Sequence, residues 1–493
     1  MTAMTFDDAA HLIRRMGFGG TADEINNLMS MDREGAVNHL VNYDNIPDDA
    51  LTALAGDGKS PTVASASFNF SDPNNNTNFN DNEIKRWWMT RMVLSQRQFQ
   101  EKMTLFWHNH FASSLSKVPR QYMFVQNLML RSHALDRFDS LLLAVAQDPA
   151  MILFLDTNTN VKAHANENWA RELQELFTMG QNNLVTGEPN YTQVDITQIA
   201  KAFTGWSFRK TPNSGPFDYQ FFVNAANHDN TVKTIYPNMT PPPTPANYDG
   251  SDIVTIIAGR EETGQFLTKK LFEFFVYPLD LTNSADIATV AKFARVYLNN
   301  DHSIKSLVTS IFTSDEFFSN RARFGLIKNP AEMIVSAIRM SGGVYVPGTP
   351  ARRDATLYTR SKNMGMDLFD PPGVQGWALN AGWINTASML ERFNYANALA
   401  TNRPADTTAV PGASIPSSTI NGFVAASAKK TVRRVLSALG PLDLGDATKP
   451  LKIYLMSDDS GNIVGFSSDA TTIDKKVRGL FHQVLSAPEF QLN

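Results

Sequence analysis

The sequence predicts a mainly α-helical protein: one large multi-helix domain with irregular loop insertions and at most one or two small β-hairpins. Apolar residues recur at helical spacing through most of the 493 residues. The segments that interrupt this spacing are rich in Pro, Gly, Asn and Ser, which is typical of loops. Hydrophobic residues make up 43% and charged residues 19% of the chain, a composition that can bury a large core.

The expected helices follow one another along the chain. The first covers FDDAAHLIRRMGF and ends at the glycines Gly17, Gly19 and Gly20, and dense helical patterns then run from Glu83 to about Asp156. Further helices are expected over residues 167–179, 193–204, 265–276, 285–298, 303–312, 331–340, 388–400 and 475–485.

Four segments depart from helical spacing. Residues 57–82 form an Asn- and Ser-rich loop, 206–250 are an irregular excursion with one hairpin, and 451–466 suggest a second hairpin. Residues 401–418 resemble a linker. We therefore expect a main helical domain over 1–400, with 57–82 and 206–250 as insertions. The linker-like loop 401–418 follows, and a C-terminal helical segment over 419–493 packs on the main domain.

Composition excludes several classes of function. The net charge is −4 and no long basic run occurs, so we expect no nucleic-acid partner. The chain has no cysteine, which excludes disulfides and thiolate metal sites. It has no apolar stretch long enough for a membrane span and no signal-peptide core at its start. The phosphate-loop, nucleophile-elbow, zinc-helix and dinucleotide-turn motifs are also absent.

The helix expected over 167–179 carries the first group of candidate residues. Asn166 is placed to cap its first turn. One face is an apolar stripe, and the other carries Glu167, Arg171 and Glu175, with Asn168 and Glu172 beside them. Pairs of Glu and Arg four residues apart are typical of a solvated helix face. The alternative is that a glutamate of this face acts as acid, base or metal ligand in a cleft.

Two histidine-bearing strings form the second group. In WHNHFASS, His108 and His110 diverge by about 200° on a continuous helix, so both reach one metal ion only if the helix ends near His108. A buried histidine bonded to a carbonyl is the alternative. In AANHDN, His228 and Asp229 lie in a loop, where either chemistry or a turn made by the Asp229 side chain explains them.

The third group is the Pro-, Gly- and Trp-rich segment FDPPGVQGWALNAGWIN, residues 369–385. It presents Trp377 and Trp383 with Asp370 and Asn380 nearby. Tryptophan faces beside amides and carboxylates are a common way to hold a sugar ring. Equally, the two indoles can anchor the loop in the helical body.

These strings together resemble a known family. FWHNHFA, NENWARELQELFTMG, DITQIAKAFTGWSF, NHDNTVKTIY and FDPPGVQGWALNAGWIN occur in the order found in the bacterial family of domain of unknown function 1800. The opening HLIRRMGFGGT and the final LSAPEFQ are similar to the usual ends of its domain. The resemblance implies one mainly helical domain and directs attention to the residues in the matching strings. It also implies export to the periplasm or beyond, and an exported sulfatase-like partner protein.

Three functions are compatible with these residues. The first is an exported hydrolase or lyase acting on an extracellular polymer such as a polysaccharide. Its expected catalytic groups are Glu167, Arg171, Glu172, Glu175 and Asp229, its substrate-binding groups Asn166, Asn168, Asp370, Trp377, Asn380 and Trp383, and its ligands for a divalent metal His108, His110 and His228. The second is a non-enzymatic exported binding or partner protein. The third is a redox metalloenzyme, which is disfavoured because its helices lack Glu-x-x-His pairs.

Overall fold

The structure is a computed structural model that describes residues 4–48, 80–211, 218–239, 242–346, 356–402 and 412–493, except 441, 443 and 468. In these ranges it contains 21 helices and two small two-stranded antiparallel sheets, which confirms the predicted fold class. No helix in the described part of the chain is long and apolar enough to cross a membrane.

The described helices and strands have the following bounds. The helices of the first half are α1 (Phe6–Met16), α2 (Ala22–Met29), α3 (Arg33–Val41), α5 (Asp81–Leu94), α6 (Gln98–His110), α7 (Arg120–Ser132), α8 (Phe138–Ala146), α9 (Pro149–Phe154), α10 (Asn168–Glu175), α11 (Gln193–Ala202) and α12 (Gly250–Ala258). Those of the second half are α13 (Glu261–Phe275), α14 (Ser284–Asn299), α15 (Ile304–Thr313), α16 (Pro330–Met340), α17 (Leu357–Asn363), α18 (Thr386–Thr401), α19 (Ser417–Phe423), α20 (Ala428–Ala438), α21 (Thr448–Met456) and α22 (Ala470–Ser486). The strands are β1 (Trp206–Lys210), β2 (Tyr219–Val223), β3 (Val344–Val346) and β4 (Gly412–Ser414).

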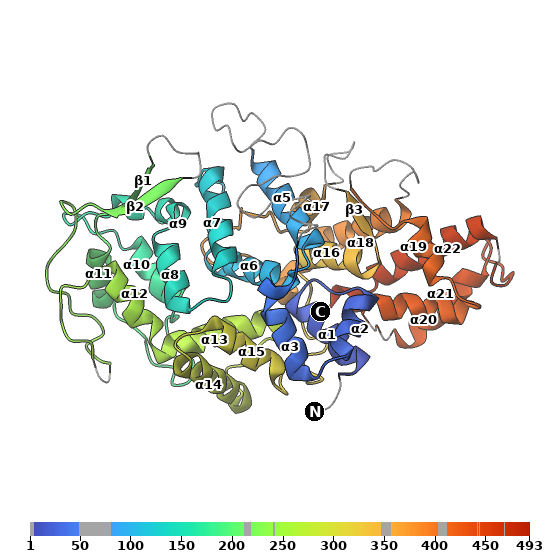
Figure 1. Ribbon diagram of the computed structural model, residues 1–493, viewed down its shortest axis with the longest axis horizontal. Helices are drawn as coiled ribbons and strands as arrows, with labels where there is room; N and C mark the ends of the chain where they lie inside the picture. Colours follow the sequence, from blue (N-terminus) through green and yellow to red (C-terminus); the bar gives the residue numbers. More distant parts are fainter. Residues whose placement is uncertain are drawn as a thin grey trace.

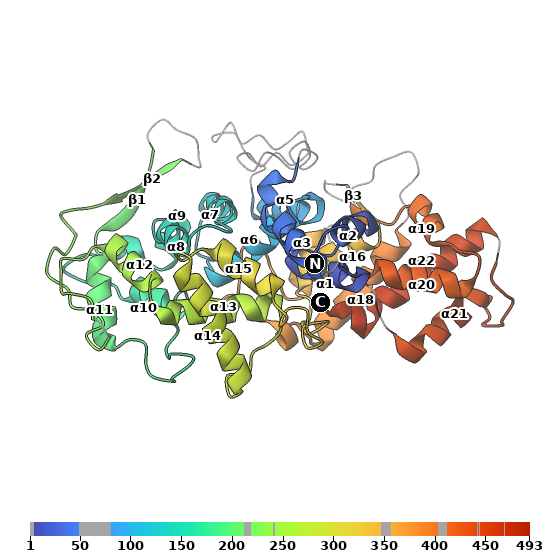
Figure 2. The ribbon, with the colours of Figure 1, turned by 60° about the horizontal axis from the view of Figure 1, so that its bottom comes forward.

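The helices form an elongated body. Helices α10 to α12 and the β1–β2 hairpin lie at one end, and α19 to α22 lie at the other (Figure 1). Helices α1 to α3 and both chain termini lie near the middle of the long axis in both views (Figure 1 and Figure 2).

Two apolar clusters hold this body together. The first joins α1 to α3 with α6, α8 and α10 to α15, and the second joins α5 with α16 to α22. Helix α6 lies between them, because Phe106 and Trp107 belong to the first cluster and Leu105 to the second. A helix that contributes to both clusters must be buried on all sides, and α6 is buried along most of its length.

Local sequence signals start several of the helices. Helices α2 and α16 begin with capping boxes, Thr21 with Glu24 and Asn329 with Glu332, in which each side chain bonds the other residue's backbone amide. Pro330 occupies the first helical position of α16, where its missing amide hydrogen costs nothing.

Several predicted elements differ in the structure. The hairpin expected within 206–250 is confirmed as β1–β2, with Trp206 opposite Val223. The prediction of a hairpin over 451–466 is wrong for its first strand, which is part of helix α21. Leu451 and Leu455 lie one helical turn apart and are both buried, which favours the helix. Residues 412–414 of the expected linker form β4, which pairs with the distant β3. Most of the expected loop 57–82 lies outside the described residues, and its last two residues start α5.

Candidate functional site

The helix expected over 167–179 is α10, which is shorter than predicted. It begins at Asn168, and its N-cap residue is Glu167 and not the predicted Asn166. Asn166 lies one residue earlier, where its Oδ1 accepts from the amide of Asn168 at 3.0 Å. The helix ends at Glu175, because the amides of Met179 and Gly180 both turn back to the carbonyl of Gln174. Gly180 has a left-handed φ of 73°, a conformation that suits glycine at a helix end.

Glu167 and Arg171 form the surface pair that the spacing predicts. A guanidinium nitrogen of Arg171 lies 3.1 Å from Glu167, and both side chains are about a third or more exposed. Glu167 also accepts hydrogen bonds from Thr197 at 2.8 Å and from Gln193 at 2.8 Å. The bond from Thr197 is the main reason that the pKa of Glu167 is lowered. Asn168, beside this pair, is exposed. These contacts tie α10 to α11.

Glu172 differs from the other carboxylates of α10. Its side chain is half-buried, and its carboxylate accepts no hydrogen bond from any residue that the structure describes. Burial raises its pKa, and the negative charge of Glu175 on the next turn adds to this. Glu175 accepts hydrogen bonds from Gln181 at 2.7 Å and from the hydroxyl of Tyr191 at 3.4 Å. Burial and the neighbouring Glu175 raise the pKa of Tyr191 to about 12, so this phenol remains a donor.

A polar pocket of about 440 Å³ opens at Tyr191, whose hydroxyl bonds Glu175; Glu172 and Glu175 themselves are not among its wall residues. Tyr191, the partner of Glu175, is part of its wall. The remaining wall comes from the segment before α11, the turn after Tyr236 and the α12–α13 junction: Pro189, Asn190, Thr192, Asp195, Tyr236, Pro237, Asn238, Met239, Gly259, Arg260, Glu261 and Glu262.

Internal hydrogen bonds fix the wall of this pocket. Asp195 accepts from the amide of Tyr236 at 2.6 Å and from the amide of Thr192 at 2.8 Å. The hydroxyl of Tyr236 lies 2.9 Å from Oε1 of Gln174 on α10. The Arg260 guanidinium stacks 4.4 Å from the Tyr236 ring and donates to Glu262 at 3.0 Å. The pocket is therefore bonded directly to α10.

Sequence reasoning missed the wall residues Tyr191, Tyr236 and Arg260. They lie in three segments that only the folded chain brings together. Tyr236 also adopts a positive φ of 47°, which is rare for an aromatic residue and carries no sequence signal.

The two histidines of α6 lie in the core and face different neighbours. Helix α6 continues through His110, so the helix end near His108 that a shared metal ion requires does not form. His108 is fully buried among Trp88, Phe369 and Trp377, and neither ring nitrogen has a hydrogen-bond partner within the described part of the chain. His110 bonds the carbonyl of Phe177 at 2.9 Å. Burial lowers the pKa of both to about 3, so both rings are neutral at physiological pH.

His228 and Asp229 hold a loop in place. Nδ1 of His228 lies 2.8 Å from the carbonyl of Thr204, whose hydroxyl accepts from the amide of Asp229 at 2.7 Å. The Asp229 carboxylate accepts hydrogen bonds from the amide and the hydroxyl of Thr231. These bonds form the turn that we considered as the alternative to a chemical role for Asp229. Across the described ranges, no three His, Asp or Glu side chains gather as a metal-ligand set. The geometry thus gives the predicted metal role no support.

The segment 369–385 is anchored in the helical body. Trp377 and Trp383 are each only 5% exposed, and the amide of Trp377 donates to Oδ1 of Asn109 at 2.6 Å. Gly376 has a φ of +81°, and a Cβ there would lie 2.4 Å from the carbonyl oxygen of Asn109, so only glycine fits.

The polar residues of this segment are also engaged in structural bonds. Ser114 donates to Asp370, and Asn380 accepts from the amide of Ile327 at 3.3 Å. With both indoles buried as well, these contacts favour the anchoring role over a sugar platform.

The site thus belongs to a mainly helical protein with a carboxylate-edged polar pocket. The family model described as protein of unknown function (DUF1800) matches residues 11–492, so the chain belongs to this family. No match to the chain was found among curated proteins or among solved structures.

Proposed function

We propose that the protein hydrolyses a glycosidic bond of an extracellular polysaccharide, with Glu172 as general acid and Glu175 as general base. The observation that carries this proposal is the state of Glu172: its half-buried carboxyl has a raised pKa and no hydrogen-bond partner among the described residues. It neighbours Glu175, whose partner Tyr191 lines a polar pocket. A raised pKa keeps the proton on a carboxyl closer to neutral pH, which a general acid requires.

The proposed step uses both carboxyl groups of α10. Glu172 gives its proton to the glycosidic oxygen as the bond from that oxygen to the sugar carbon breaks. The Glu175 carboxylate takes a proton from the water whose oxygen bonds to the same carbon, so two hydroxyl groups replace one ether. The proton returns from Glu175 to Glu172 through solvent. Tyr191 is a positioning residue, since its hydroxyl bonds Glu175.

The pocket supports a hydroxyl-rich ligand. Its volume of about 440 Å³ lies within the range of small-molecule sites. Its wall offers the side-chain amide of Asn238 and the phenol of Tyr191, which can bond hydroxyl groups. The extracellular location in this proposal comes from the family resemblance.

The test is a release assay on a panel of neutral, acidic and amino polysaccharides, with new reducing ends as the readout. We expect the wild type to act on at least one polymer and Glu172→Gln to be at least about 100-fold slower. Glu188→Gln is the matched control, because Glu188 lies on an exposed loop nearby. A Glu172→Gln variant that matches the wild-type rate overturns the proposal.

A group of exposed apolar side chains close together in the sequence favours a second candidate, a binding or partner protein. Four side chains at the start of α18 and just before it are 36–59% exposed: Leu379, Ile384, Leu390 and Phe393. Adjacent exposed apolar side chains of this kind commonly mark a protein interface. Binding to a purified exported sulfatase-like protein that Leu390→Glu abolishes, together with no activity on any polymer, would favour this candidate over the hydrolase.

A further inference from the structure

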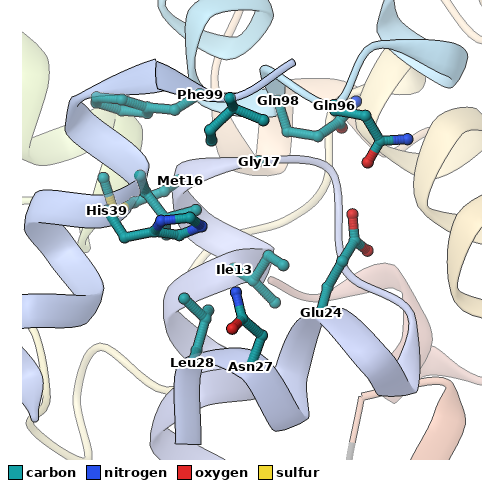
Figure 3. Close-up of a pocket in the computed structure, with 12 residues that line it drawn as sticks. Ile13, Met16, Gly17, Glu24, Asn27, Leu28, His39, Gln96, Gln98 and Phe99 are labelled. Carbon is teal, nitrogen blue, oxygen red and sulfur yellow. The ribbon is translucent and has the colours of Figure 1, made fainter. Parts of the chain in front are cut away.

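A second pocket lies in the middle of the molecule, far along the chain from the carboxylates of α10. It is bounded by α1, α2, α3 and the start of α6 (Figure 3). Its volume is about 180 Å³. The opening motif HLIRRMGFGG supplies part of its wall through Ile13, Met16 and Gly17, so this motif has a place in the structure that the proposed hydrolase does not explain.

The inner part of this pocket is apolar. Ile13, Met16, Leu28 and Phe99 line it, and each is at most 5% exposed. A cavity of about 150 Å³ lined by aliphatic and aromatic side chains stays dry and binds benzene. The pocket therefore has room for one ring-sized apolar group.

The outer part of the pocket carries polar side chains with unused hydrogen-bonding capacity. Asn27, His39 and Gln96 have no side-chain hydrogen-bond partner among the residues that the structure describes (Figure 3). Glu24 holds one donor on each carboxylate oxygen, the amide of Thr21 at 2.7 Å and the guanidinium of Arg339 at 2.6 Å. A carboxylate has about four acceptor positions, so Glu24 can accept further donors.

We propose that this pocket binds a small amphipathic molecule: one ring-sized apolar group with a neutral or cationic head that donates hydrogen bonds. The ring lies on Ile13, Leu28 and Phe99, and the head lies between Glu24 and the free amides. An anionic head is disfavoured, because the described wall residues include the carboxylate of Glu24 and no lysine or arginine, and the one guanidinium near Glu24, that of Arg339, already bonds it.

Three probes of equal size test the proposal: benzyl alcohol, benzylamine and benzoate, titrated into the full chain at pH 7. We expect benzyl alcohol and benzylamine to bind and benzoate to bind at least about tenfold more weakly, which is about 1.4 kcal/mol. The 13C-labelled methyl group of Met16, assigned with Met16→Leu, reports binding at this pocket, since Met16 lines it. Absence of any shift of this methyl at about 10 mM benzylamine overturns the proposal.

A charge variant tests the role of Glu24. Glu24→Gln keeps the capping box, because glutamine serves at that position as well as glutamate does. We expect it to remove the preference for benzylamine over benzoate while benzyl alcohol binds as before. Glu34→Gln, an exposed change on neighbouring α3, should leave all three affinities unchanged. Equal binding of benzylamine and benzoate by the wild type overturns the assignment of the head group. These binding measurements do not depend on catalysis by Glu172, so a failure of this proposal is distinct from a failure of the proposed function.

Discussion

Glu101 on α6 and Glu172 on α10 are both helical glutamates, yet their surroundings are opposite. Glu101 is fully buried and accepts hydrogen bonds from Arg91 at 3.0 Å and from Arg131 at 2.8 and 2.9 Å. Burial alone would raise its pKa, but the two guanidinium groups outweigh this and hold it at about 2. Glu172 is half-buried, no described residue bonds it with a positive charge, and its pKa is raised.

The difference shows that the partner, more than the depth of burial, decides what a carboxylate does. A buried carboxylate with two bonded arginines stays ionised and holds three helices together, α5, α6 and α7. A carboxyl that is partly buried and not bonded to a cation keeps its proton up to a higher pH, so it can donate that proton in a reaction. Glu101 is therefore structural, and Glu172 is the candidate for chemistry.

The largest expected effect is the loss of the buried charge at Glu101. Glu101→Gln removes the buried negative charge that bonds the guanidinium groups of Arg91 and Arg131, so we expect the free energy of unfolding to fall by about 3–5 kcal/mol in urea titrations. The control Glu188→Gln should stay within about 0.5 kcal/mol of wild type. Because the pKa of Glu101 is lowered from 4.5 to about 2, its contribution is present above pH 4.5 and is lost as the pH falls toward 2. A loss under about 1 kcal/mol would contradict the structural role.

Asp148 is a buried carboxyl that no cation contacts among the described residues, and it sharpens the comparison. It caps α9 by accepting from the amide of Met151 at 3.0 Å and accepts from Gln126 at 2.8 Å. Burial raises its pKa from 3.8 to about 7. The folded state therefore binds the proton more tightly, and wild-type stability should fall as the pH rises from about 4 to about 7.

Asp148→Asn tests this directly, because asparagine is an equally good cap. At pH 8 we expect the variant to be more stable than wild type by up to about 4 kcal/mol, from about three pH units at about 1.4 kcal/mol each. At pH 4 the two proteins should be similar. Urea titrations at both pH values measure the difference. A variant that is less stable at pH 8 shows that Asp148 has a cationic partner in solution.

Glu172→Gln should change stability little. Since its pKa is raised, the Glu172 carboxylate costs folding free energy above pH 4.5, and a neutral glutamine should be neutral or slightly stabilising, within about 0.5 kcal/mol. Thermal unfolding at pH 7 measures this, with Glu188→Gln as the control. A large destabilisation would show that Glu172, like Glu101, has a structural role.

Periodicity was sufficient to predict most of the helices but not the site. The stripe of Trp169, Leu173 and Phe177 is buried as its spacing requires. The pocket wall was out of reach, because Tyr191, Tyr236 and Arg260 converge only through long-range contacts that helical spacing does not encode.

Two predictions from the sequence differ from the structure for related reasons. LKIYLM reads equally well as a strand or a helix, and packing of α21 on α20 and α22 selects the helix. The polar ring of His108 made it a candidate metal ligand in the sequence. In the structure the indole of Trp377, from segment 369–385, packs against this ring in the core. In both cases the neighbour that decides the outcome lies elsewhere in the chain.

The smallest expected effect on activity is that of Glu167→Gln, at the residue just before the helix that carries Glu172. The Glu167 carboxylate is held ionised by Thr197, Gln193 and Arg171, which suits a surface anchor and not a general acid. Exposed pairs contribute little, so we expect a stability loss below about 1 kcal/mol and a rate of polymer hydrolysis within about threefold of wild type. Reducing-end release by Glu167→Gln and Glu172→Gln, measured side by side, separates the two residues. If Glu167→Gln loses activity and Glu172→Gln keeps it, the acid is the partnered carboxylate and the comparison fails.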